Sequence, residues 1–137
     1  MNQKWLLIDM HMHSQFSKLN KPGDKDKVKD MSAKEFVDIL HNKKVEIFSI
    51  TDHNYFSSDY YNSIDSYIKD SNLDMKLING VELDVYVSLN DGKEDIIHVC
   101  FYFDNTVDRT ELEKIINNLY KDESENDKKP HFKDILY

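Results

Sequence analysis

Apolar and polar positions follow one another along the chain in short blocks that predict strands and helices in turn. Lys4 to Asp9 is a brief apolar run, too short for a helix, and is typical of a buried strand. A second such run, Val45 to Ile50, predicts the next strand. Between them, Ser32 and Glu35 match a capping box that begins a helix ending near Lys43. The residues that this helix should turn inward are Phe36, Val37, Ile39 and Leu40.

The next segment repeats the pattern. A helix capped by Ser57 or Ser58 should run to about Asp70, and a strand should begin near Met75. Strand, helix and strand in this order predict an α/β fold with a parallel sheet, in which chemistry gathers at the carboxyl ends of the strands. The helical stripe consists of Tyr60, Tyr61, Ile64, Tyr67 and Ile68.

A β-hairpin is expected after the third strand. Apolar and polar residues alternate from Val81 to Ser88, and Asn90-Asp91-Gly92 is a strong turn signal. The return strand, Ile96 to Phe103, places His98 on one face with Ile96, Cys100 and Tyr102. A last helix should open at Asp108 or Thr110 and turn four apolar residues inward: Leu112, Ile115, Ile116 and Leu119.

Candidate metal ligands follow the predicted strands. Because alternate residues of a strand share a face, His11 and His13 can project side by side, with Asp9 one step deeper as a partner for a ligand histidine. His53 follows the second strand, Glu82 lies in the third and His98 in the fourth. Each alone is more often structural than a ligand.

Together these five residues fall where the topology brings side chains to one rim. Imidazole and carboxylate donors suit Zn, Mn or Fe. Glu82 could bridge two ions, and Asp52, beside His53, could orient a ligand or accept a proton. His41 and His131 are more simply structural, and Cys100 is more simply a small buried residue than a soft ligand.

Composition narrows the class of protein. The chain has 137 residues, 39% of them hydrophobic, which is enough for one ordinary core. A net charge of −8 argues against a general nucleic-acid coat, although bound cations would reverse the local sign at a metal site. The single Cys100 fits a reducing, cytoplasmic setting, and no apolar stretch approaches the roughly 20 residues of a membrane span.

Four ordered motifs resemble the opening of the PHP family, named for polymerase and histidinol-phosphatase members. They are Asp9-Met10-His11-Met12-His13-Ser14, Ile50-Thr51-Asp52-His53-Asn54, Gly80-Val81-Glu82, and His98 on an apolar strand. The resemblance implies the front portion of a distorted (β/α)7 barrel, here with parallel strands and a β-hairpin insertion. It also implies two or three divalent ions, Mn, Zn or Fe, with His11, His13, His53, Glu82 and His98 as ligands and Glu82 bridging.

The chain departs from the family pattern in two places. Many members carry an Asp where this chain has Lys18, and no Asp-x-His follows residue 103. A full barrel needs on the order of 200 residues or more. We therefore expect residues 1–120 to be an incomplete PHP-like domain and residues 121–137 a charged linker and tail. The hairpin also resembles that of family members that precede an ATPase-type region.

The expected function is that of a metal-dependent phosphoesterase acting on a phosphate-ester or nucleotide-type substrate, as a fragment or N-terminal domain of a larger protein. Glu82 and Asp52 would be its catalytic carboxylates. One alternative is a catalytically incomplete half that binds a partner chain or forms an oligomer. Another is an amidohydrolase-type barrel, which also begins with His-x-His; the Thr51-Asp52-His53-Asn54 segment favours PHP.

Overall fold

A computed structural model describes residues 5–18, 30–120 and 130. The predictions made for the loop at Pro22-Gly23 and for residues 121–129 and 131–137 lie outside the described residues. In chain order the elements are β1 (Leu7–Met12), α1 (Ala33–Asn42), β2 (Val45–Ile50), α2 (Ser58–Asp70), β3 (Lys76–Ser88), β4 (Glu94–Phe103) and α3 (Arg109–Leu119).

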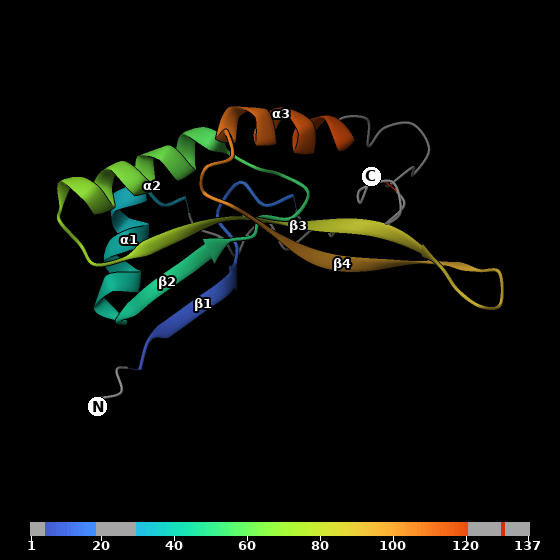
Figure 1. The fold of residues 1–137 in the computed structure, drawn as a ribbon, viewed down its shortest axis with the longest axis horizontal. Coiled ribbons are helices and arrows are strands. Elements are labelled where there is room, and N and C mark those ends of the chain that lie inside the picture. Colours follow the sequence, from blue (N-terminus) through green and yellow to red (C-terminus); the bar gives the residue numbers. More distant parts are fainter. Residues whose placement is uncertain (1–4, 19–29, 121–129, 131–137) are drawn as a thin grey trace.

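The four described strands form one mixed sheet in the order β1-β2-β3-β4. β1 pairs with β2, and β2 with β3, in parallel, as the βαβ pattern predicts. β3 and β4 form the expected antiparallel hairpin, which extends well past the ends of β1 and β2 (Figure 1). The predicted α/β class and the hairpin are confirmed.

A side-chain cap begins each of the three helices in the described part of the chain. The Ser32 side chain accepts from the Glu35 backbone N–H and the Glu35 carboxylate accepts from Ser32 N, so the predicted capping box is confirmed. Ser57 caps α2 and Asp108 caps α3. These caps satisfy backbone donors that a helix leaves unpaired at its first turn.

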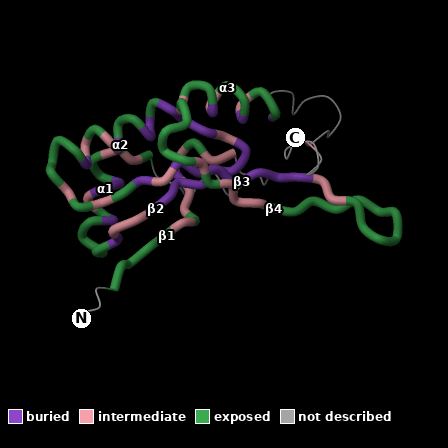
Figure 2. Tube along the Cα trace, viewed as in Figure 1, coloured by how far each residue is buried: buried purple, intermediate pink, exposed green. Residues whose placement is uncertain are grey.

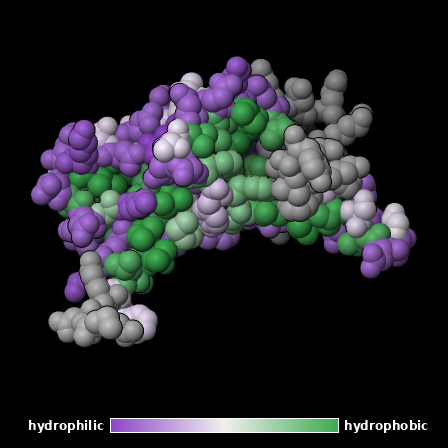
Figure 3. Space-filling view, in the orientation of Figure 1, coloured by the Kyte–Doolittle hydropathy of each residue, from purple (hydrophilic) through white to green (hydrophobic). Residues whose placement is uncertain are grey.

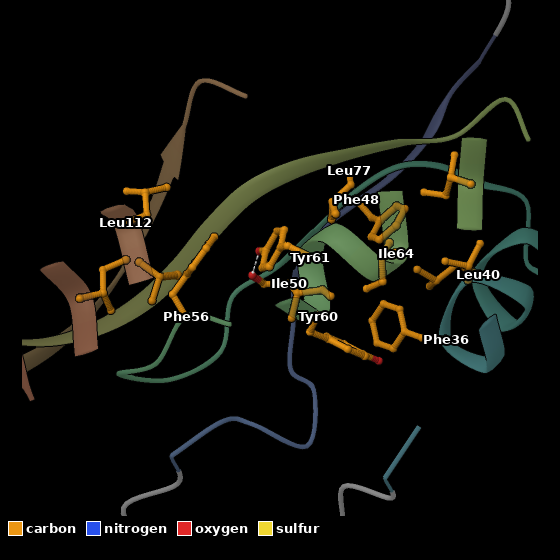
Figure 4. Packing of buried hydrophobic residues seen from close by; sticks show 14 of the residues in the cluster. Phe36, Leu40, Phe48, Ile50, Phe56, Tyr60, Tyr61, Ile64, Leu77 and Leu112 are labelled. Atoms are coloured by element: carbon orange, nitrogen blue, oxygen red, sulfur yellow. Dashed lines mark hydrogen bonds between the residues drawn. The ribbon is translucent and has the colours of Figure 1, made fainter. Parts of the chain in front are cut away.

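The helices pack on one face of the sheet and bury a single apolar core. Phe48 and Ile50 of β2 are fully buried against α1 and α2, with Ile64 at the same level (Figure 4). Tyr61 links this core to the sheet, because its hydroxyl donates to the carbonyl of Ile50 and accepts from Gly80 N at 3.1 Å. Val81, Leu83 and Val85 of β3 continue the core beneath α3.

The prediction that the first apolar run is a buried strand is wrong. β1 lies at the edge of the described sheet, and Figure 2 shows it exposed where β2 and the middle of β3 are buried. Trp5, Leu6, Leu7 and Ile8 are exposed by 88%, 47%, 51% and 50%. Figure 3 shows the corresponding apolar surface over the β1 region. The run is apolar, yet no described element covers it.

Three residues expected to face the core are exposed instead: Ile39, Ile115 and Leu119. Each lies beside a buried residue of its helix, at the border of the apolar stripe. The core-facing stripes of α1 and α3 are therefore narrower than the sequence suggests, with Leu112 and Ile116 as the buried residues of α3.

Candidate metal centre

The segment that follows β2 is tied to the middle of β3 by backbone hydrogen bonds. Glu82 N donates to the Asp52 carbonyl at 3.2 Å, and Asn54 N donates to the Glu82 carbonyl at 2.8 Å. Asn54 adopts φ 54°, a left-handed conformation that asparagine tolerates better than most residues. Its side-chain oxygen accepts from Asp84 N at 2.9 Å. These contacts fix His53 beside the β3 carboxylates.

Glu82 and Asp84 lie on the sheet face away from the helices. They alternate with Val81, Leu83 and Val85 of the core, and successive side chains of a strand point to opposite faces. Asp84 is directly opposite His98 of β4 in the sheet register. The ligand-type residues of β3 and β4 therefore meet on one surface.

Glu82 lies at the centre of a first group of donor atoms. Its Oε2 is 3.1 Å from His11 Nε2 and 2.8 Å from His13 Nε2, and its Oε1 is 3.1 Å from His98 Nδ1. Burial raises the pKa of Glu82, but hydrogen bonds from His11 and His13 outweigh it, so the pKa lies below its usual value. Glu82 is thus a carboxylate at neutral pH.

A second group is formed by His53, Asp84 and His98. Asp84 Oδ1 is 2.5 Å from His53 Nε2 and 3.1 Å from His98 Nε2. Asp84 is fully buried, whereas the His98 side chain is 56% exposed. His98 therefore contacts both groups, one through each ring nitrogen.

The tautomer of His53 follows from its surroundings. Its Nδ1 is 2.7 Å from the Lys18 carbonyl, which can only accept, so Nδ1 carries a hydrogen and donates it. Lys18 N in turn donates to the His53 carbonyl, and His53 N donates to Ser17 Oγ. A backbone carbonyl behind the ring is the usual arrangement for a histidine that ligates a metal through its other nitrogen.

The donor set fits a divalent transition metal. In each of the groups His11–His13–Glu82 and His53–Asp84–His98, the three potential ligand atoms lie within 4.8 Å of one another. Two imidazole nitrogens and one carboxylate oxygen are a set that Zn and Fe sites in proteins use. The residues present could therefore hold metal ions.

The sequence-predicted residues fall into two sets. The structure brings together His11, His13, His53, Glu82 and His98. It places Asp52 apart from them, with Oδ1 accepting from Ser14 N at 2.5 Å and Oδ2 from Ser14 Oγ at 2.6 Å. Burial raises the pKa of Asp52, and the Ser14 bonds partly offset this. Asp9 contacts the backbone N–H of His11, and not its ring, at 3.3 Å.

Sequence reasoning missed Asp84. The signal was present, because Asp84 shares strand parity with Glu82, and the predicted hairpin leads back to His98. His41 is exposed in the last turn of α1, outside both groups. Cys100 lies opposite Glu82 in the hairpin, half-buried, and burial raises the pKa of its thiol.

A scan of the chain against protein-family models finds no match, and a search of curated proteins finds none either.

Proposed function

We propose that this chain is a metal-dependent phosphoesterase related to the PHP family, whose barrel its βαβ sheet and hairpin would begin. The observation that carries the proposal is the convergence on Glu82 of imidazoles from two other segments, His11 and His13 from the end of β1 and His98 from β4. These candidate metal ligands meet at the carboxyl ends of parallel strands, which is where α/β enzymes bind their substrates and cofactors.

The chain's own residues have distinct parts in the proposed reaction. Divalent ions at this centre would supply positive charge to a bound phosphate and lower the pKa of a nearby water. His11, His13, His53, Glu82 and His98 would hold the ions. Asp52 would act through Ser14, whose position next to His13 it fixes by two hydrogen bonds. Proton acceptance by Asp52 remains a prediction, for which its raised pKa is favourable.

The test is phosphoester hydrolysis by protein loaded with Mn²⁺ or Zn²⁺. Wild type should hydrolyse a phosphomonoester or a short oligonucleotide, and the His11→Ala, His13→Ala double variant should lose turnover. The matched control is His41→Ala, which removes an exposed imidazole outside both groups. If wild type turns over no faster than the double variant, the proposal fails for this chain.

The exposed apolar residues of β1 favour a second candidate, a binding module that pairs with a partner chain or a second copy. An edge strand offers unpaired backbone groups, and Leu6, Leu7 and Ile8 add apolar surface beside them. This candidate predicts a dimer or larger species by light scattering, which Leu6→Lys with Ile8→Lys should convert to monomer. A monomeric wild type would exclude self-association.

No helix in the described part of the chain has the length and apolarity needed to cross a membrane.

A further inference from the structure

We infer that Asp84 is a metal ligand and that it forms, with His53 and His98, a second cation site beside the one at Glu82. The sequence motifs assign no role to Asp84. The inference rests on the metal-binding part of the proposed function and adds a carboxylate ligand to it. It does not depend on which ester the protein hydrolyses.

The three residues come from three separate segments and point at one place. His53 follows β2, Asp84 is in β3 and His98 is in β4. The two Nε2 atoms lie 2.5 Å and 3.1 Å from the same oxygen, Asp84 Oδ1. A cation at this point would take two imidazole nitrogens and one carboxylate, with further positions left for water or substrate.

A buried ion pair is the simpler explanation for Asp84 and His53 alone, because a fully buried carboxylate needs a compensating charge. Two further observations point to a cation. His98 brings a second imidazole to the same oxygen, which a single ion pair does not require. The other ring nitrogen of His53 is held by the Lys18 carbonyl, which orients Nε2 toward Asp84.

The exposure of His98 supplies a way in. The His98 side chain is 56% exposed, whereas the side chains of Asp84 and His53 are only 0% and 5% exposed. The exposed His98 ring therefore marks the side from which an ion would approach the buried carboxylate. A buried donor pair with one exposed donor has the entry path that a working metal site needs.

His98 also connects the two sites, because one of its ring nitrogens lies near Glu82 and the other near Asp84. If Nε2 ligates the ion at Asp84, Nδ1 carries the hydrogen and donates it to Glu82 Oε1, 3.1 Å away. This bond holds Glu82 so that Oε2 stays between His11 and His13. Filling the Asp84 site would therefore orient the carboxylate of the Glu82 site.

The experiment is a titration of the metal-free chain with Co²⁺, followed by calorimetry and by the visible absorption of the ion, with bound metal counted by mass spectrometry. Wild type should bind two ions per chain. Asp84→Asn, which keeps the shape of the side chain and removes its charge, should bind one. The His11→Ala, His13→Ala variant should also bind one, with the absorption spectrum of the Asp84 site.

Two variants secure the interpretation. Asp95→Asn removes a negative charge from an exposed position of β4 and should still bind two ions. His53→Gln should lose the same ion as Asp84→Asn, so the test survives if one variant folds poorly by circular dichroism. Equal metal content in wild type, Asp84→Asn and His53→Gln would overturn the inference, whether the count is none, one or two.

The outcomes separate this inference from the proposed function. Two ions in wild type and one in Asp84→Asn, with no phosphoester turnover, would support the site and refute the activity. Turnover that depends on His11 and His13, with unchanged metal content in Asp84→Asn, would do the reverse.

Discussion

Replacing Gly80 with alanine should destabilise the protein, because β3 passes β2 at this point with no room for a side chain. A Cβ at Gly80 would lie 2.2 Å from Ser49 Oγ, and 3.2 Å from both Thr51 Cγ2 and Tyr102 Cδ1. Ordinary contacts begin near 3.4 Å, so Ser49 Oγ would have to move by about 1 Å, either by rotation of the buried side chain or by separation of the strands. Overpacking of this kind costs about 1–3 kcal/mol, and we expect a value at the upper end.

Ser49→Ala provides the control, since it removes the closest colliding atom. In a double-mutant cycle, Gly80→Ala should cost at least about 1 kcal/mol less in the Ser49→Ala background than in wild type. Urea denaturation followed by circular dichroism measures each free energy of unfolding, with the m-value as a check on two-state behaviour.

The same strand carries Glu82 two residues further on, so any metal that the proposed centre binds should fall in Gly80→Ala and recover in the double variant. The reasoning would be refuted if Gly80→Ala changed stability by less than about 0.5 kcal/mol. If Gly80→Ala lowered the free energy of unfolding equally in the wild-type and Ser49→Ala backgrounds, Ser49 Oγ would not be the atom with which the new Cβ collides.

Three smaller predictions concern the core and the helix ends. Tyr61→Phe leaves Gly80 N without the hydroxyl that accepts its hydrogen bond. The free energy of unfolding, measured by urea denaturation, should fall by about 1–3 kcal/mol. A fall of less than about 0.5 kcal/mol would mean that water replaces the hydroxyl. Ser32→Ala breaks the α1 capping box and should lower the free energy of unfolding by about 1 kcal/mol. Ser66→Ala, at an exposed position inside α2, should lower it by less. Equal losses in the two variants would contradict a stabilising role for the cap. Burial raises the pKa of Tyr60 from 10.0 to about 12. The tyrosine of the unfolded state therefore loses its proton first, and the free energy of unfolding should fall as pH rises from about 10. A Tyr60→Phe variant with the same pH dependence of stability would exclude this cause.

The helix starts and the hairpin could be predicted because their signals are local. Ser32 and Glu35 contact each other within one turn, so their spacing alone specifies the cap. Asn90-Asp91-Gly92 specifies its turn in the same way, with Gly92 at φ 78°, a conformation that favours glycine. No distant residue is needed for either element.

The environment of β1 could not be predicted, because burial depends on which elements pack nearby. Leu7 and Ile8 have the composition of a central strand, and only the sheet order reveals that they lie at its edge. Ile39 and Ile115 fail for a related reason, since periodicity defines an apolar stripe without fixing its width.

The candidate site could be predicted as far as strand ends define it. His11, His13 and Glu82 follow from parity and from the convergence of parallel strands. The link between Asp84 and His98 depends on the pairing register of β3 and β4, which the alternation of apolar and polar residues does not specify. The contact of Asp52 with Ser14 arises from a loop conformation that no periodic pattern encodes.

The position of Cys100 gives the chain a chemical probe of its own centre. It is the single thiol of the sequence, and it lies opposite Glu82 in the hairpin, beside His98. Its alkylation by maleimide can therefore be assigned without mapping. Because a raised pKa keeps the half-buried thiol protonated, labelling should be slow in the folded protein, and its rate should change when an ion or a substrate occupies this face. One rate constant would thus report whether the centre at Glu82 is occupied.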